Sequence, residues 1–534
     1  MMVYDTDLDN LFIWTGAAWE SVPASGDSTD TQVIFNDNGL LDGDPGLTYS
    51  KSLARLTVGQ AIDIWKGNFQ DSGSTAVGST ALASTIAGGI NNTAIGFRSQ
   101  RFNTSGANNT SVGRESLPSL GFAGNNNTAV GFSAGFSLTT GASNTLVGTS
   151  AGLRMVTGGS NTALGVNALY SVVNASGSNN VAVGRNAMTA LDSGSSNVAI
   201  GNEAMDSAAG IVGSNNICVG SAAMKSSGSI SGSDNVGIGR DTFRNLTSGA
   251  NNIGIGTSAL NLVSSGLSNV AIGPVAGYQI TTGLANVAIG INCMNGNQLV
   301  TGSSNVAIGD GAIYCVGGAA LSGGNNVAIG PASGRRLTTG SSNVFVGNSA
   351  GNSANDISGA NNIGIGQSVF RNLTSGSSNV AIGDTALNGN TTGFFNVAIG
   401  SGSMFTNQVG TDNVAIGINS LYSATTSGNT AIGRASLGSL TSGGNNIGLG
   451  YGAGGNLTTG VTNICIGVNA YAEGAGSSNQ LSIGSAAYYV GTNGGANTYY
   501  ATANTGVTAP PAGATGFWRV IINGTARKIA VYGD

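Results

Sequence analysis

A five-residue pattern of apolar and polar positions recurs along most of this chain: asparagine, a β-branched residue, a small residue, an aliphatic residue and glycine. It occurs 24 times between residue 74 and about residue 484, and most neighbouring copies are 17 residues apart. The unit that begins at Asn379 reads NVAIGDTALNGNTTGFF. Apolar residues at alternate positions of a short run bounded by asparagine and glycine predict a β-strand.

Each copy of the pattern predicts a strand with two unlike faces. Val380 and Ile382 share one face, and the small residue Ala381 between them lies on the other. We expect such a strand to be buried on both faces, with a close neighbour against the small face. The pair Ala386-Leu387 predicts a second short strand in the unit, and the polar stretch after it predicts the turn back.

A single unit cannot bury its own aliphatic residues, but stacked units share a continuous core. The sequence therefore predicts an all-β fold, a parallel β-roll or β-solenoid of about 24 coils with a 17-residue repeat. The asparagine that opens the pattern is present in 22 copies, and the exceptions are Ser74 and Gln480.

Stacking places these asparagines above one another. The array predicts an amide ladder in which each side chain bonds the coils above and below. The alternative is that asparagine serves only as a turn residue. We favour the ladder, because aspartate and serine would suit a turn equally well yet seldom occur here. Its members include Asn144, Asn161, Asn180, Asn197, Asn252, Asn269, Asn286, Asn379 and Asn396.

Composition narrows the class of protein. Glycine accounts for 90 of 534 residues and charged residues for only 8%, which excludes an average globular enzyme. Seven prolines are too few for collagen, and 40% apolar residues are too many for generic disorder. A net charge of −5 gives no basic footprint for nucleic acid, and no apolar run is long enough to insert into a membrane.

The residues offer little catalytic chemistry. The chain has no histidine, and its four glutamates lie many coils apart. We expect the scattered aspartates to be turn residues, and we expect no catalytic residue, metal site or cofactor. The cysteines lack metal-ligand spacing and stand off register for disulfides, so they are predicted to fill the core. They are Cys218, Cys293, Cys315 and Cys465.

The NVAIG units that continue into an alanine–leucine pair resemble the head repeats of trimeric autotransporter adhesins of the YadA type. The resemblance covers about 410 residues. It implies a left-handed parallel β-roll wound as a homotrimer, in which the small-residue face or the Ala-Leu strand meets two identical chains around a central axis. The units here are about three residues longer than those of the family, which places the extra residues in the loops.

The two ends of the chain resemble other proteins. The segment VYDTDLDNLFIWTGAAWESV, within residues 1–22, resembles a small β-module of bacteriophage tail and fibre proteins, and residues 31–59 resemble the short β-repeats that follow it there. Near the C-terminus, Asn523-Gly524 between two apolar runs predicts a hairpin. The expected organisation is β modules for virion attachment in 1–70, a shaft in 71–484 and a hairpin cap or tip in 485–534.

These observations predict a non-enzymatic structural fibre of a phage virion, joined to a tail or capsid component and reaching a glycan or protein receptor on the host. A bacterial surface adhesin is an alternative, but neither a secretion signal nor a membrane anchor is recognisable. A polysaccharide depolymerase and an ice-binding protein fit less well. The sequence does not identify the receptor contact, although the longer loops in about 290–330 and the pair Phe394-Phe395 are candidates.

Overall fold

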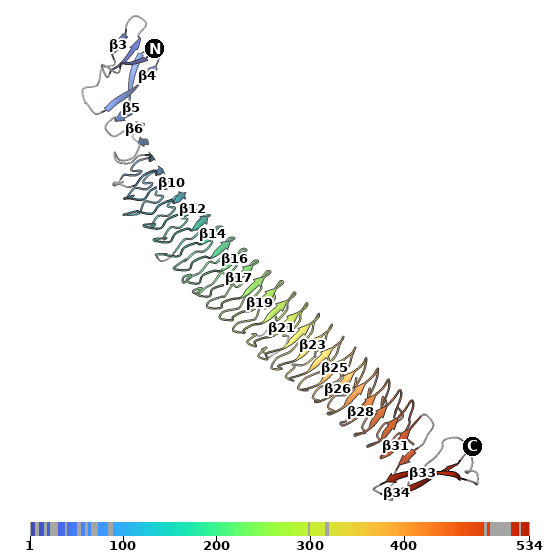
Figure 1. Cartoon of the computed structure of the whole chain (residues 1–534). Helices are drawn as coiled ribbons and strands as arrows, with labels where there is room; N and C mark the ends of the chain where they lie inside the picture. Colours follow the sequence, from blue (N-terminus) through green and yellow to red (C-terminus); the bar gives the residue numbers. More distant parts are fainter. Residues whose placement is uncertain are drawn as a thin grey trace. The chain divides into compact units, whose positions relative to one another are not determined.

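The repeated pattern forms short parallel strands stacked side by side (Figure 1). The computed structural model describes residues 73–484 with their side chains, except 84–88, 172–173, 297–298 and 316–319. In the terminal segments it describes the backbone of the strands. The chain divides into two units, Met1–Thr339 and Gly340–Asp534.

The first unit contains strands β1 to β22. Strands β1–β3 form an antiparallel sheet, β4–β8 pair antiparallel in chain order, and β8–β22 pair parallel in chain order. Their bounds are β1 Met2–Asp5, β2 Asn10–Trp14, β3 Trp19–Ser21, β4 Asp30–Asp37, β5 Leu40–Ser50, β6 Arg55–Val58, β7 Ile62–Trp65, β8 Thr75–Val77, β9 Thr93–Ile95, β10 Thr110–Val112, β11 Thr128–Val130, β12 Thr145–Val147, β13 Thr162–Leu164, β14 Val181–Val183, β15 Val198–Ile200, β16 Ile217–Val219, β17 Val236–Ile238, β18 Ile253–Ile255, β19 Val270–Ile272, β20 Val287–Ile289, β21 Val306–Ile308 and β22 Val327–Ile329.

The second unit contains strands β23 to β34. Strands β23–β31 pair parallel in chain order, β31 and β32 pair antiparallel, and β33 and β34 form a separate hairpin. Their bounds are β23 Val344–Val346, β24 Ile363–Ile365, β25 Val380–Ile382, β26 Val397–Ile399, β27 Val414–Ile416, β28 Thr430–Ile432, β29 Ile447–Leu449, β30 Ile464–Ile466, β31 Gln480–Ile483, β32 Tyr489–Gly491, β33 Ala514–Ile522 and β34 Thr525–Tyr532.

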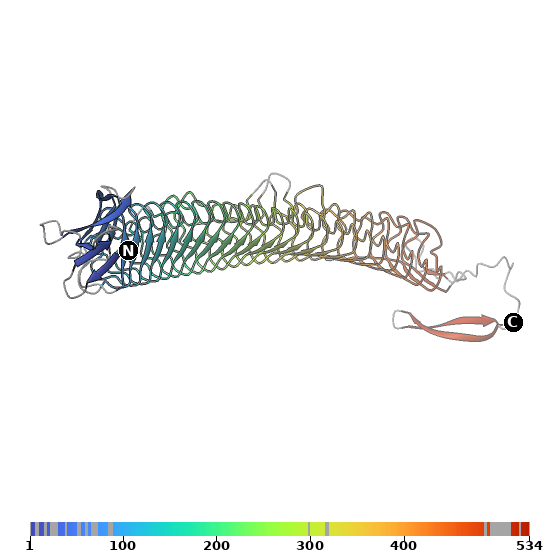
Figure 2. The ribbon, with the colours of Figure 1, turned by 90° about the horizontal axis from the view of Figure 1, so that it is seen from above.

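The predicted fold class is confirmed. Every described copy of the pattern forms a parallel strand, and the register is that of the sequence repeat, as in the pairing of Val270 with Val287 and of Ala271 with Ala288. Figure 2 shows these strands running along one side of the coils. The described residues contain no helix. At the C-terminus, β33 and β34 pair from Ile522 with Thr525 outward, which leaves the two residues Asn523-Gly524 to connect them.

The core lies inside each coil and is narrow. The small middle residue of each strand is buried, as Ala271 is, whereas its neighbours Val270 and Ile272 are half-buried or exposed. The expectation of a strand buried on both faces is therefore wrong for a single chain. Alanine and glycine occupy most inner positions because a 17-residue coil has no room there for a column of larger side chains; Leu146 and Phe345 are isolated exceptions.

The predicted second strand is also wrong. The Ala-Leu pair lies in a turn, and both of its side chains point into the core, as Ala259 and Leu260 do. Consecutive residues of a strand point to opposite faces, so a strand could not bury both. The backbone achieves this with left-handed conformations two and four residues after the closing glycine, with φ of 57° at Ser258 and 49° at Leu260.

Candidate interaction surfaces

In each unit, the first and third residues of the strands within β8–β30 form an outward apolar surface, which Leu481 and Ile483 continue in β31; we call it the branched face. It consists almost entirely of valine, isoleucine and threonine. Ile255, Ile272 and Ile289 succeed one another in its third-residue column. Ile272 is 38% exposed, so a single chain leaves this surface partly open to solvent. Continuous apolar surface of this kind is unusual on a monomeric protein and marks an interaction site.

The resemblance placed the chain–chain contact on the small-residue face or on the Ala-Leu pair. Both are enclosed inside the coil, as the fully buried Ala288, Ala259 and Leu260 show. Neither can touch another chain. Among the candidate surfaces, the branched face is the one that remains accessible.

The opening asparagines lie inside the coils and bond to one another. Asn269 illustrates the geometry. Its Nδ2 donates to Asn252 Oδ1 at 3.0 Å and to the Gly283 carbonyl at 2.8 Å. Its Oδ1 accepts from the backbone N–H and the Nδ2 of Asn286, at 3.0 and 3.1 Å. Aspartate lacks the two donors and serine lacks the reach, which explains why asparagine recurs.

Hydrogen bonds of this kind run in two series, one in each unit. In the first unit they link successive asparagines from Asn92 to Asn326, and in the second from Asn343 to Asn463. The nine asparagines named from the sequence belong to these series and are all buried. Seven are in the first unit and two in the second: Asn144, Asn161, Asn180, Asn197, Asn252, Asn269 and Asn286, then Asn379 and Asn396.

The two exceptions to asparagine stand at the ends of the ladder. Ser74 Oγ accepts the backbone N–H of Asn92 at 2.8 Å. At the other end, the backbone N–H of Gln480 donates to Asn463 Oδ1 at 3.0 Å, while its side chain exchanges hydrogen bonds with Glu473. Each of these two residues therefore bonds to the single ladder asparagine next to it, Asn92 or Asn463.

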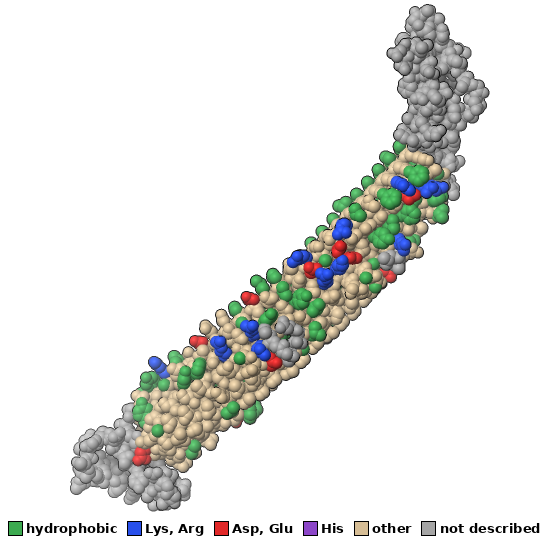
Figure 3. Space-filling model, turned by 180° about the vertical axis from the view of Figure 1, so that it is seen from behind, with side chains coloured by type: hydrophobic (Ala, Val, Ile, Leu, Met, Phe, Trp, Pro, Cys, Tyr) green, Lys and Arg blue, Asp and Glu red, His purple; other side chains and the backbone are tan. Residues whose placement is uncertain are grey.

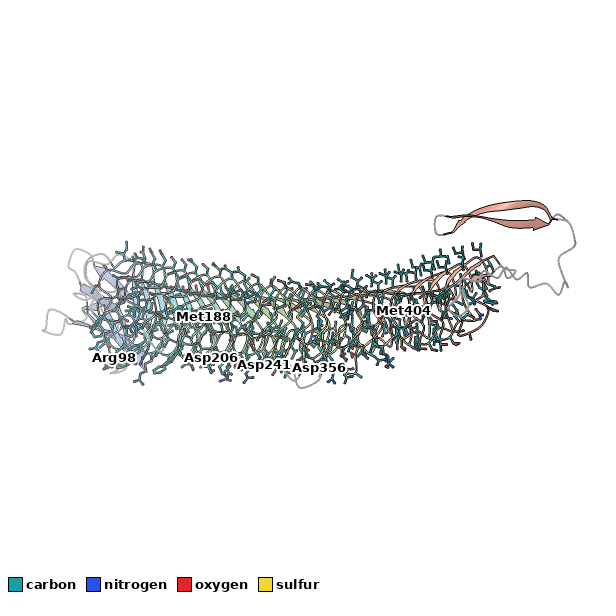
Figure 4. The ribbon with its side chains drawn as sticks, turned by 90° about the horizontal axis from the view of Figure 1, so that it is seen from below. Arg98, Met188, Asp206, Asp241, Asp356 and Met404 are labelled. Carbon is teal, nitrogen blue, oxygen red and sulfur yellow. The ribbon has the colours of Figure 1, made fainter. Side chains whose placement is uncertain are left out.

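A second surface carries the charges. Every lysine and arginine of residues 73–484 falls within the six residues that follow a closing glycine, and we call this part of the coils the charged side. Figure 3 shows charged side chains gathered on one face among hydrophobic ones. In Figure 4, the labelled Arg98, Asp206 and Asp241 of the first unit project along one edge, whereas Met188 lies within the coils. This surface was not among the sequence-based predictions, because it becomes evident only when the positions of the basic residues are counted from the closing glycine.

In the middle of the charged side, basic side chains form ion pairs with acidic side chains of the same chain. Lys225 Nζ lies 2.7 Å from Glu203 Oε2 and 3.3 Å from Asp206 Oδ2. The hydrogen bond from Lys225 lowers the pKa of Glu203, and the same bond raises the pKa of Lys225. Arg244 lies 2.8 Å from Asp241. The pKa of Glu203 is therefore shifted in the direction opposite to the one that a general acid requires.

The cysteines fill the core. All four are buried thiols outside any disulfide. Burial raises the pKa of the Cys293 thiol to about 12 and that of Cys465 to about 11, and it raises the pKa of Cys218 further still. Within the described residues, no cluster of three or more potential metal-binding side chains is found.

The loop candidates are only partly described. Phe394 and Phe395 are 45% and 59% exposed and meet edge to face at 5.3 Å, on a part of the coil that is neither the branched face nor the charged side. In the segment 290–330, residues 297–298 and 316–319 lie outside the described residues. The predicted attachment modules in 1–70 and the cap in 485–534 have described strand backbones only, so their predicted roles stay predictions.

The described geometry defines a β-solenoid with an apolar outer face. The sequence matches no protein-family model and no curated protein. Within the described residues, no helix has the length and apolar character needed to cross a membrane.

Proposed function

We propose that this chain is a non-enzymatic fibre protein that assembles as a homotrimer of left-handed coils and serves a phage virion in host attachment. The observation that carries the proposal is the branched face. Its half-exposed columns continue from coil to coil, and a symmetric assembly would cover them on every chain at once. The number three and the handedness come from the resemblance to the adhesin head repeats.

An identical chain is the partner that best fits this surface. The branched face repeats with the coil spacing, and a second copy of the chain repeats with the same spacing. Apolar side chains of two such faces can therefore stay in register over many coils. A closed ring of copies also removes the exposed face completely, whereas an unrelated globular partner would cover only a few coils.

The oligomeric state tests the proposal. Native mass spectrometry of the full chain should return a mass of three chains. A triple variant, Ile255→Gln, Ile272→Gln and Ile289→Gln, should lower the trimer fraction because it places uncompensated amides in the apolar contact. A mass of one chain for the unmodified protein would overturn the trimer.

The chain offers a matched control. Leu267, Leu284 and Ile291 are exposed to similar extents, 41%, 43% and 51%, but lie outside the branched face. Their replacement by glutamine should leave the trimer intact. If both triple variants lose trimer equally, general destabilisation and not the branched face is responsible.

The virion role rests on the terminal segments and needs its own test. Antibodies against the repeat should decorate a projecting fibre on phage particles. Incubation of the protein with host polysaccharide should release no new reducing ends, since we expect no catalysis. Labelling of bacterial cells without phage, or release of reducing ends, would favour the adhesin or depolymerase alternatives respectively.

A further inference from the structure

In the N-terminal coils, the charged side carries arginines placed over aromatic rings. Arg114 lies between two phenylalanines of neighbouring coils, 5.8 Å from the ring centre of Phe97 and 5.7 Å from that of Phe132. Arg101 lies 4.6 Å from the ring centre of Phe102. Phe97 and Phe132 are 40% and 46% exposed, so the rings also offer open surface.

These arginines differ from the basic side chains of residues 185–244, which form ion pairs with acidic neighbours. Arg98 pairs with Glu115 at 3.2 Å, but neither Arg101 nor Arg114 forms an ion pair with a described residue. Three arginines thus stand with one glutamate on a chain whose net charge is −5. A guanidinium stacked on a ring keeps its planar edge of N–H donors free for a carboxylate, and the ring limits its rotation in advance.

We propose that an arginine–phenylalanine patch binds the carboxylates of an acidic polysaccharide. The patch consists of Phe97, Arg101, Phe102, Arg114 and Phe132. Excess positive charge selects the anionic group. The exposed rings accept the apolar faces of the sugars between carboxylates. Neighbouring coils present these groups in a row, which suits an extended polymer with a charge on each repeating sugar.

The inference deepens the proposed attachment function, because it names the class of host molecule that the fibre meets. It is compatible with the proposed trimer, since the patch belongs to the charged side and the chain–chain contact to the branched face. The two proposals can fail separately. A trimer that ignores acidic polysaccharide would remove only this inference, and a monomer that binds it would remove only the trimer.

Calorimetric titration of the full chain tests the patch, with polygalacturonate as the acidic probe and dextran as the neutral one. Saturable binding is expected for polygalacturonate alone. Arg101→Gln with Arg114→Gln should weaken it by about tenfold or more, because two charge-assisted contacts are lost. Phe97→Leu with Phe132→Leu keeps the charge and should weaken binding severalfold through loss of stacking.

Arg240→Gln with Arg244→Gln is the matched control, because these arginines lie on the same side of the coils but near Asp241. It should change the affinity by less than about twofold. Equal losses in both arginine pairs, or no binding to polygalacturonate, would overturn the proposal. Tighter binding of a single-stranded oligonucleotide than of polygalacturonate would also overturn it, since stacked bases and phosphates would then be the better ligand.

Discussion

Removal of one rung, Asn269→Ala, tests the role of the amide ladder. The alanine variant keeps the backbone N–H that donates to Asn252 Oδ1 at 2.9 Å. It leaves two buried groups without their bonds, the Gly283 carbonyl and the backbone N–H of Asn286. An unpaired buried polar group costs about 1–3 kcal/mol, so the local loss should be about 2–6 kcal/mol.

Hydrogen exchange measures this loss better than global melting, because each coil contacts only its neighbours and repeat arrays need not unfold in one step. A cost of 2 kcal/mol or more corresponds to exchange roughly 30-fold faster or more at the Asn286 amide. Amides near Asn463, many coils away, should be unchanged. The control Ser268→Ala alters the exposed preceding residue, where Ala285 already occupies the equivalent left-handed position.

A second variant of the same rung, Asn269→Asp, separates hydrogen bonding from packing. One carboxylate oxygen still accepts from Asn286. The other replaces the amide nitrogen and faces two acceptors, Asn252 Oδ1 and the Gly283 carbonyl. Burial without a cation should raise its pKa above the unfolded value, so the variant should gain stability as the pH falls and the carboxyl protonates. The result that would refute the reasoning concerns Asn269→Ala. If the Asn286 amide of that variant exchanges at a rate within about threefold of the native rate, the ladder bonds add little stability.

Three further predictions follow from the core and the backbone. Gly237→Ala would place a Cβ 2.9 Å from Phe243 Cδ2 and should cost about 1–3 kcal/mol, and Phe243→Leu should recover most of it in a double-mutant cycle measured by thermal unfolding. Val275 has a φ of 60°, so Val275→Asn should raise stability by about 1 kcal/mol in the same assay, whereas a loss would mean that its packing outweighs the strain. The raised pKa and the burial of Cys293 and Cys465 predict no reaction with a thiol reagent at pH 8 until the protein is denatured, and rapid native labelling would contradict this.

The strand of each coil could be predicted from the sequence because alternation and repeat spacing are local signals. The pattern around Val270 marks both the strand and its register, since each copy pairs with the next at the same positions. The prediction of a strand at the Ala-Leu pair is wrong for a definite reason. Small-plus-large pairs suit a strand, but here left-handed residues such as Leu260 turn both side chains inward. Only glycine adopts that conformation readily, so an ordinary residue gives no local sign of it.

The orientation of the strand was also beyond local reasoning. A β-branched residue on one face and alanine on the other normally places the branched residue in the core, because it buries more apolar area. In this protein the size of the coil decides. Three kinds of side chain already fill the enclosed space: the Ala-Leu pair, the ladder asparagine, and one aliphatic residue that follows the Ala-Leu pair, such as Val263. The larger side chains of Val270 and Ile272 must therefore face outward.

This inversion links the narrow coil to assembly. A coil too thin to enclose its β-branched residues leaves them as a continuous outer column, and water makes that column unfavourable in proportion to its exposed area. The lysines and arginines are kept away from it, on the six residues after each closing glycine. One side of the coil is therefore free to pack against identical chains while the charged side stays in solvent. In the proposed trimer, the same division would leave Arg114, between Phe97 and Phe132, accessible to a ligand.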